Sequence, residues 1–321
     1  MSRLERGIAV VLLSVGLWHP ALAQQDAYPS KPIRLVVCCT GFPEAVARLL
    51  AEQVSEQAKQ PVVVDPRPGA NGILGASIVA KSAPDGYTMF LGTNSTHAAN
   101  QSLYKSLPYD FVKDFTPVSG ISQGALMAAV NPALPVQSIA ELTALARKEP
   151  GKLNYGWASS STRIAVELYK QTMGLQITSV PYKTVPQAAT DVAGGHLDFM
   201  IGDMVSLPPL VAAGKLRALA VTGVNRMRNL PDVPTMQEAG VPGYALTFWL
   251  AAYLPAGAAP TVTQRLNALV TAALNSARVK EFLINAGSEP YPTTPEELMR
   301  FQVAEHDKWR KVIVGAGISP E

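Results

Sequence analysis

The chain alternates short apolar runs with longer stretches in which apolar residues recur every three or four positions. Residues 33–37 form an apolar run typical of a buried strand, and residues 44–59 carry the single apolar face of an amphipathic helix. Two further strands are predicted at 61–64 and 88–91, with a helix near 72–81 between them. This β-α-β-α order indicates an α/β fold built on a largely parallel sheet.

A second series of the same kind begins after Val118 and is followed by a helical tail. Because no flexible linker separates the two series, we expect two lobes, with candidate chain crossings near 119–123 and 222–225. The strands predicted in the second series are 153–155, 177–181, 197–200 and 216–221. The helices predicted from there to the end lie near 138–150, 163–173, 186–193, 262–274 and 279–287, and a last one opens at Thr294.

The first residues have the composition of an export signal. Arg3 and Arg6 give a basic start, residues 7–17 are apolar, and Ala21-Leu22-Ala23 provides the small residues of a cleavage site. The apolar stretch is too short to span a bilayer, so we interpret 1–23 as a signal peptide and not as an anchor. The mature chain is therefore expected to be exported.

Composition and charge narrow the class of protein. Hydrophobic residues make up 48% of the 321 positions, which is enough for well-filled cores. The 27 basic and 24 acidic residues leave a net charge of +3, which is too small and too evenly spread to indicate nucleic acid or a membrane surface. We therefore expect no nucleic acid partner.

The two cysteines, Cys38 and Cys39, are neighbours at the end of the first predicted strand. Adjacent Cα atoms lie about 3.8 Å apart, below the spacing of about 4.4–6.8 Å in ordinary disulfides, so a bond between them would be strained. We interpret them as two small hydrophobic residues. No histidine or further cysteine lies at a metal-ligand spacing from them, and we expect neither a metal nor a cofactor.

The stretch from Asn154 to Met173 is the most informative in the chain. A short strand is followed there by the hydroxyl residues 159–162, and an amphipathic helix then begins near Arg163. Hydroxyl side chains cap the backbone N–H groups at a helix start, and those groups bind anions with the help of the helix dipole. An arginine in this turn opposes the dipole, which a carboxylate ligand would compensate. We predict an anion site here, with a solvent-facing Arg163 as the alternative.

Three other short loops follow predicted strands and are also rich in small or hydroxyl residues, namely 38–44, 92–97 and 202–203. Ligands of open α/β sheets bind at the carboxyl ends of the strands, so we expect the four loops to converge on one cleft. Taken alone, each loop is better interpreted as an ordinary turn or helix cap, whereas the four together favour a site. The predicted ligand contacts are Thr40, Gly41, Phe42, Thr93, Asn94, Ser95, His97, Trp157, Ser159, Ser160, Ser161, Thr162, Arg163 and Asp203.

No convincing catalytic group accompanies this site. A triad of Ser95, His97 and Asp203 can be written, but the sequence has no Gly-x-Ser-x-Gly elbow. The histidines that follow the signal peptide match no zinc signature. We expect a binding protein without catalytic residues, and a periplasmic hydrolase that uses His97 is the alternative.

Several phrases, spread in order over the whole mature chain, resemble one known family. They are YPSKPIR at 28–34, APDGY at 83–87, GTN at 92–94, LPYD at 107–110, VPYK at 180–183, GKLRALAV at 214–221 and PDVPT at 231–235. Each phrase is moderately specific, whereas the ordered set is highly specific. The set is similar to the Bug-type solute receptors of tripartite tricarboxylate transporters.

The resemblance implies a two-lobed periplasmic binding protein of type II topology with two chain crossings at the hinge. We expect lobe 1 to comprise 24–122 and 225–321, and lobe 2 to comprise 123–224. Such a receptor captures a small carboxylate between its lobes and delivers it to membrane permease subunits. We expect this chain to do so as a monomer.

The resemblance also places the ligand. It assigns the carboxylate contacts to 40–44, 93–97 and 158–163, and it puts an aspartate that discriminates between ligands at the position of Asp203. Two of these loops are shorter than is usual in the family, and they carry Phe42, Trp157 and Arg163. A flat, aromatic carboxylate is therefore one hypothesis. A sensory receptor that docks on a membrane kinase, and a receptor that has lost binding, remain alternatives.

Overall fold

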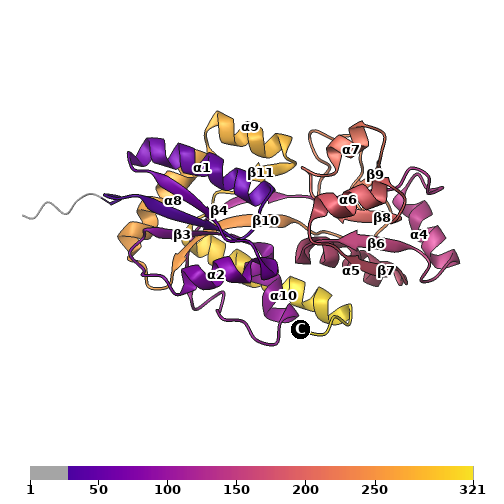
Figure 1. Ribbon diagram of the computed structural model, residues 1–321, viewed down its shortest axis with the longest axis horizontal. Helices are drawn as coiled ribbons and strands as arrows, with labels where there is room; N and C mark the ends of the chain where they lie inside the picture. The colour runs from indigo at the N-terminus through magenta and orange to yellow at the C-terminus, as the bar shows by residue number, and fades with distance from the viewer. Residues whose placement is uncertain (1–27, 321) are drawn as a thin grey trace, which may run out of the picture.

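The computed structural model describes residues 28–320, and the predicted signal peptide lies outside them. Two β-sheets, each flanked by helices, form two lobes side by side along the long axis of the molecule (Figure 1). Among the described residues, no helix is both long enough and apolar enough to cross a bilayer.

The sheet of lobe 1 has six strands and is mixed. Its order is β11 (Ser288–Pro290), β4 (Phe115–Gly124), β10 (Phe248–Pro255), β3 (Thr88–Thr93), β1 (Ile33–Val37), β2 (Val62–Pro66). β1 is parallel to β2 and β3, but β10 is antiparallel to both β3 and β4. The expectation of a largely parallel sheet was therefore wrong for half of this lobe. The reason is that β10 returns from the other lobe and enters the sheet in the reverse direction.

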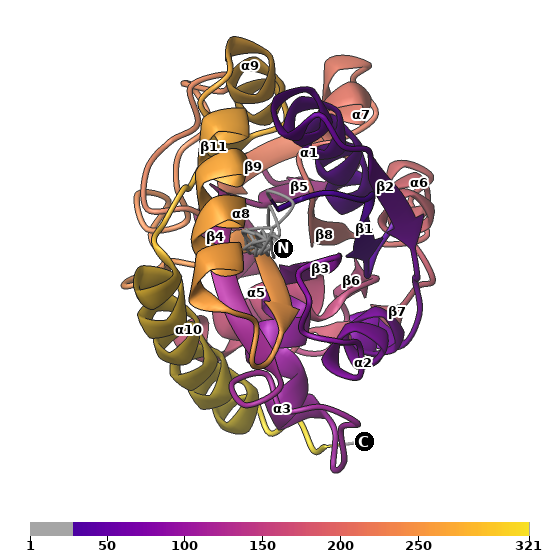
Figure 2. The ribbon, with the colours of Figure 1, turned by 90° about the vertical axis from the view of Figure 1, so that its left-hand side faces the viewer.

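Helices cover both faces of this sheet. Leu35 and Val37 of β1 pack with α1 (Phe42–Ala58), α8 (Pro260–Leu274) and α9 (Ala277–Asn285), whereas Val36 faces the opposite core. This alternation follows from the period of two along a strand. The second face carries η1 (Ala70–Gly72), α2 (Ile73–Ala80), η2 (Ser95–Ala99), α3 (Asn100–Leu103) and α10 (Pro295–Gly315). Figure 2, in which lobe 1 faces the viewer, shows α2 and α10 on different flanks.

The sheet of lobe 2 has five strands in the order β7 (Thr178–Pro181), β6 (Asn154–Trp157), β8 (Phe199–Gly202), β5 (Met127–Val130), β9 (Arg217–Val221). β6 is parallel to β7 and β8, while β5 is antiparallel to β8 and β9. Its helices are α4 (Ile139–Lys148), α5 (Ser160–Met173), α6 (Val185–Ala193) and α7 (Pro208–Ala212).

The chain crosses between the two sheets after β4 and again between β9 and β10. Thr222 joins the crossings: its N–H donates to the Leu126 carbonyl at 2.9 Å, and its hydroxyl accepts from the Leu126 N–H at 2.8 Å. The predicted first crossing at 119–123 lies inside β4, because these residues pair with β10. The two-lobed α/β fold of type II is confirmed, and the limits 24–122, 123–224 and 225–321 remain our proposal for the lobes.

Further contacts hold the lobes together away from the crossings. α10 packs against β4 and η2 of lobe 1 and also against α5 of lobe 2. The Tyr244 hydroxyl, in the segment that leads into β10, donates to the Ala165 carbonyl of α5 at 2.8 Å. Glu305 anchors α10 to its own sheet, because one carboxylate oxygen accepts from the indole N–H groups of Trp249 and Trp309.

Candidate functional site

Loops from the two lobes meet where β3 and β6 end. The Asn94 side-chain amide, at the end of β3, donates to the Ser161 hydroxyl at the start of α5, with a distance of 2.8 Å. Asn94 is buried, as are its neighbours Thr93 and Ser95. Two segments that are far apart in the sequence and that we predicted to share a site therefore touch directly.

On lobe 1 the turn after β3 is fixed by hydroxyl groups. The Thr96 hydroxyl accepts from the Thr93 N–H and donates to the Thr93 carbonyl, each at 3.0 Å. The chain then continues as η2, a π-helical turn, which is a rare geometry often found at functional sites. These bonds hold Asn94 toward the other lobe.

On lobe 2 the helix α5 begins at Ser160, three residues earlier than predicted. Ser159 caps it: its hydroxyl accepts from the Thr162 N–H at 3.3 Å, and its own N–H donates to the Thr162 hydroxyl at 3.1 Å. Both hydroxyls are thus engaged in the capping box that fixes the helix start. The capping box does not use the side chains of the other residues in this turn, Ser160, Ser161 and Arg163, which are therefore available for other contacts.

Arg163 and Ser160 each contribute a buried polar atom without a partner. Arg163 stacks its guanidinium on the Trp157 ring, with Cζ 4.9 Å from the ring centroid, while its Nε is buried and unbonded. The Ser160 hydroxyl is also unbonded, on a residue only 2% exposed. Within residues 28–320, no carboxylate lies at ion-pair distance from Arg163. A buried unpaired polar group costs about 1–3 kcal/mol, so a bound acceptor would be favoured here.

Trp157 is held in place as a platform for Arg163. Its indole N–H donates to the Ser179 hydroxyl of β7 at 2.7 Å, and the side chain is half-buried. A cation over an aromatic face is attracted by the ring quadrupole, which positions the guanidinium. The ring face covered by Arg163 is therefore not free for an aromatic ligand.

The loop between β1 and α1 divides into an exposed and a buried part. Thr40 and Gly41 are exposed, and Gly41 has a φ of 78°, in the region that favours glycine. Phe42 instead lies in the core of lobe 1. Its ring is 5.3 Å from Phe248 in an edge-on arrangement and 6.4 Å from Phe282 in a stacked one, between centroids. Phe42 is therefore a packing residue, and a contact between it and the ligand stays a prediction.

Asp203 organises the turn that follows β8. One of its carboxylate oxygens accepts from the backbone N–H groups of Val205 and Ser206, and the other accepts from the Ser206 hydroxyl. The next residue, Met204, reaches lobe 1, because a β-carbon placed on Gly287 would lie 2.6 Å from its side chain. This turn therefore belongs to the boundary between the lobes, and Asp203 remains a predicted ligand contact.

The structure corrects the prediction for His97. The residue has no exposed surface, and its ring stacks on Tyr253 with 3.8 Å between centroids. Its Nδ1 is hydrogen-bonded to the Thr96 hydroxyl at 2.9 Å, and no hydrogen bond joins it to Asp203 among the described residues. Burial lowers its pKa to about 3. A neutral, fully enclosed imidazole can serve neither as ligand contact nor as catalytic base, so the proposed triad does not form.

His97 should make the stability of the protein depend on pH. Its pKa is about 3 in the folded chain, whereas an unfolded histidine has about 6.5, so protons bind the unfolded state in preference. Stability is then highest above pH 6.5 and falls through the window between these two pKa values. At pH 5 the loss from this one group is about 2 kcal/mol. Denaturant unfolding of wild type and His97→Gln at pH 7.5 and pH 5 measures this loss. The free energy of unfolding should fall more between the two pH values in wild type than in the variant, and an equal fall in both would contradict the prediction.

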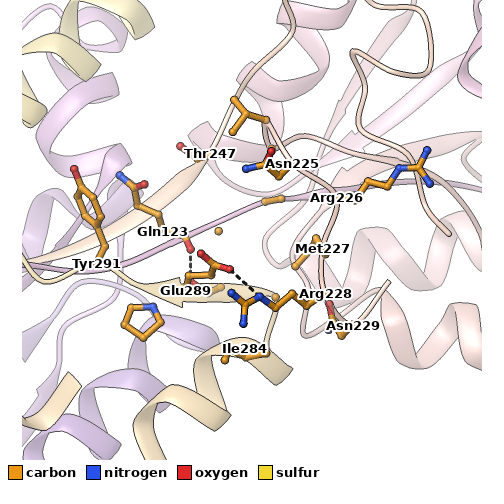
Figure 3. A pocket seen from close by; sticks show the side chains of 17 residues that line it. Gln123, Asn225, Arg226, Met227, Arg228, Asn229, Thr247, Ile284, Glu289 and Tyr291 are labelled. Carbon is orange, nitrogen blue, oxygen red and sulfur yellow. Dashed lines mark hydrogen bonds and ion pairs between the residues drawn. The ribbon is translucent and has the colours of Figure 1, made fainter. Parts of the chain in front are cut away.

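A separate pocket of about 250 Å³ lies at the hinge, between the 223–229 segment and the connection from α9 to β11 (Figure 3). β11 pairs with β4 on the side away from β3 and β1, so this pocket is on the other flank of the crossings. Arg228 faces Glu289 across it, with 3.6 Å between Nε and Oε1. None of the predicted site residues lines the pocket.

Two lobes joined by two crossings, with polar groups from both gathered between them, form the architecture of a two-lobed solute-binding protein. The chain matches the family model described as tripartite tricarboxylate transporter family receptor over residues 46–318. It belongs to this family, as its sequence pattern predicted.

Individual relatives agree with this assignment. The protein BugT of Bordetella pertussis is 33% identical over 322 residues, which cover 99% of this chain and 98% of that one. A solved structure described as R. palustris Rpa4515 with adipate is 38% identical, with a TM-score of 0.86 over 92% of this chain and all of the other. MatC from Rhodopseudomonas palustris with bound malate is 28% identical, with a TM-score of 0.80 over 89% of this chain and 100% of that one.

Proposed function

We propose that this protein is an exported receptor that closes its lobes around a small carboxylate and passes it unaltered, as a monomer in the periplasm, to the permease subunits of a tripartite transporter. Membership of the receptor family supports the transport role. The buried, neutral His97 and the absence of the Ser95-His97-Asp203 triad in the described residues remove the basis for the hydrolase alternative.

One observation carries the proposal. Arg163 Nε and Ser160 Oγ are buried without partners in the first turn of a helix, next to the hydrogen bond between Asn94 and Ser161 that joins the lobes. An arginine there lacks a compensating acid, while helix-start N–H groups and hydroxyls surround it. Ser160 and Arg163 are three positions apart on one helix face, and a carboxylate has two oxygens that accept such hydrogen bonds.

The ligand class that fits best is an aliphatic dicarboxylate. Lobe 2 offers Arg163 and the α5 start to one carboxylate, and lobe 1 offers the β3 turn with Thr93 and Asn94 to the other. The similar proteins of known structure hold adipate and malate, both dicarboxylates. An aromatic ligand is less favoured, because Phe42 packs in the core and Arg163 covers one face of Trp157. The test below therefore includes an aromatic acid.

Calorimetric titration with matched compounds tests this proposal. Adipate, hexanoate and 1,6-hexanediol share a six-carbon chain and carry two, one and no carboxylates, with a methyl end in hexanoate and hydroxyl ends in the diol. Malate and benzoate test length and aromaticity. We expect binding to weaken from adipate to hexanoate and to vanish for the diol. Micromolar affinity requires only about 8 kcal/mol in total, which a few charge-assisted hydrogen bonds can supply. Tight binding of benzoate with none of adipate or malate would overturn the dicarboxylate assignment.

The bond between Asn94 and Ser161 should contribute to closure. A neutral hydrogen bond adds about 0.5–1.5 kcal/mol, so either Asn94→Ala or Ser161→Ala should weaken adipate binding by about 2–12-fold. Because both changes remove this one bond, its energy is lost only once in the double variant, which should bind more tightly than the product of the two single losses predicts. Fully additive losses in this double-mutant cycle would show that the two side chains act independently.

A further inference from the structure

Two thiols meet at the end of β1, beside the proposed ligand site. Cys38 Sγ and Cys39 Sγ lie 2.9 Å apart, and both cysteines are free in the structure. Cys38 is 1% exposed, whereas Cys39 is half-buried. We propose that these adjacent cysteines are a redox modification site, at which a reversible vicinal disulfide reshapes the loop that enters α1 and changes ligand affinity.

Packing around the two cysteines differs, and this difference decides which of them can move when a disulfide forms. Cys38 is enclosed: a β-carbon on Gly72 would lie 3.3 Å from its Sγ, and one on Gly75 would lie 3.2 Å from its Cα. The next residues, Thr40 and Gly41, are exposed, and nothing lies within 4 Å of a β-carbon on Gly41. Formation of the bond must therefore displace Cys39 and the Thr40-Gly41 turn, while Cys38 stays in place.

The two thiols differ in reactivity. The hydrogen bond from Cys38 lowers the pKa of the Cys39 thiol, and the same bond together with burial raises the pKa of Cys38. Cys39 is thus the thiolate that attacks, and Cys38 is the resolving thiol. This division matches their accessibilities.

The chemistry balances with a small-molecule disulfide as the oxidant. Cys39 attacks one sulfur of the oxidant, forms a mixed disulfide and releases the first reduced thiol. Cys38, on losing its proton, attacks Cys39 Sγ and expels the second. Two protein thiols lose two electrons and two protons, and one disulfide is reduced to two thiols.

Strain makes the bond reversible. Neighbouring Cα atoms are held about 3.8 Å apart by the peptide, whereas ordinary disulfides span about 4.4–6.8 Å. Strained disulfides are the more easily reduced and serve as labile, regulatory bonds. The link to ligand affinity rests on the proposed function, because the same loop is assigned to one wall of the carboxylate site.

Mass spectrometry of the mature chain tests the modification without any ligand. The protein is treated with oxidised glutathione or with excess dithiothreitol, then denatured and alkylated. We expect the oxidised sample to be monomeric, two hydrogen atoms lighter and unalkylated, and the reduced sample to be alkylated at both cysteines. Cys38→Ser should accumulate the glutathione adduct at Cys39, and Cys39→Ser should remain largely unmodified. Full alkylation after oxidation, or a disulfide between two chains, would overturn the proposal.

Adipate titration of the two forms tests the consequence. We expect the oxidised and reduced proteins to differ in affinity by at least about threefold, which is about 0.7 kcal/mol. The Cys38→Ser/Cys39→Ser variant should give one affinity under both treatments. Equal affinities of the two wild-type forms would overturn the effect on the ligand site. If neither form binds adipate or malate, the proposed function fails, while the mass result still decides the modification.

Discussion

Alanine in place of Arg163 is expected to weaken adipate binding by at least about tenfold and by up to about 150-fold. A hydrogen bond to a charged partner contributes about 1.5–3 kcal/mol, and this range of energies gives the range of affinities. Arg163 has no acidic partner within residues 28–320 and its Nε is buried, so the ligand is the group that would satisfy it. The change should leave folding nearly unaffected, because Arg163 forms no ion pair within residues 28–320 and its guanidinium stacks on the half-buried Trp157.

Two variants make the Arg163→Ala result specific. Arg163→Lys keeps the charge but loses the planar fork, so it should recover only part of the affinity. Arg228→Ala removes an equal charge from the hinge pocket, where Arg228 is 77% exposed, and should leave adipate affinity unchanged. If Arg228→Ala weakened binding and Arg163→Ala did not, the ligand site would be the hinge pocket.

Phe42→Ala is expected to lower the free energy of unfolding by about 3–5 kcal/mol, the usual cost of truncating a buried phenylalanine. Phe42 is 8% exposed and packs on Phe248 and Phe282, so its removal leaves a cavity between α1, α9 and the start of β10. Urea unfolding measures the change. Val224→Ala, at a position 70% exposed, is the matched surface control and should have little effect.

The same variant separates packing from ligand binding. If Phe42 lined the ligand site, Phe42→Ala would reduce affinity for benzoate and leave stability close to that of wild type. We expect the reverse, namely a less stable protein whose relative affinities for adipate and benzoate are unchanged.

Local patterns predicted much of the fold. The strand β1 was placed at its observed bounds, because Ile33–Val37 is apolar apart from Arg34 and its four apolar residues are buried on both faces of the sheet. β10 was missed, although Phe248–Pro255 is also strongly apolar. Its identity as a strand depends on pairing with β3 and β4, which precede it by a long stretch of chain.

The site was predictable where it follows from topology. Asn94 and Ser161 each follow the end of a strand, and strand ends of open sheets converge, so their contact agrees with the sequence-based reasoning. The burial of Phe42 and His97 was not predicted, because it depends on remote partners, Phe248 for one and Tyr253 for the other. Position in a loop identifies a candidate residue, but long-range packing decides which way its side chain points.

The second crossing was predicted near 222–225, where the chain leaves β9, but the contact that joins it to the first crossing was not. Thr222 looks like any hydroxyl residue after a strand, yet it joins the two crossings through hydrogen bonds to Leu126. Only the folded chain brings these segments together. The hinge pocket likewise combines residues from four separate segments, none of which has a distinctive sequence pattern.

Amide hydrogen exchange with and without saturating adipate tests most directly whether a small carboxylate is held between the lobes. We expect slower exchange in two separate segments, 93–97 of lobe 1 and 158–164 of lobe 2, and an unchanged rate at 223–229. Adipate recovered from the denatured complex should have its original mass. Protection confined to one lobe or to the hinge segment, or no protection by adipate at any concentration, would contradict the account.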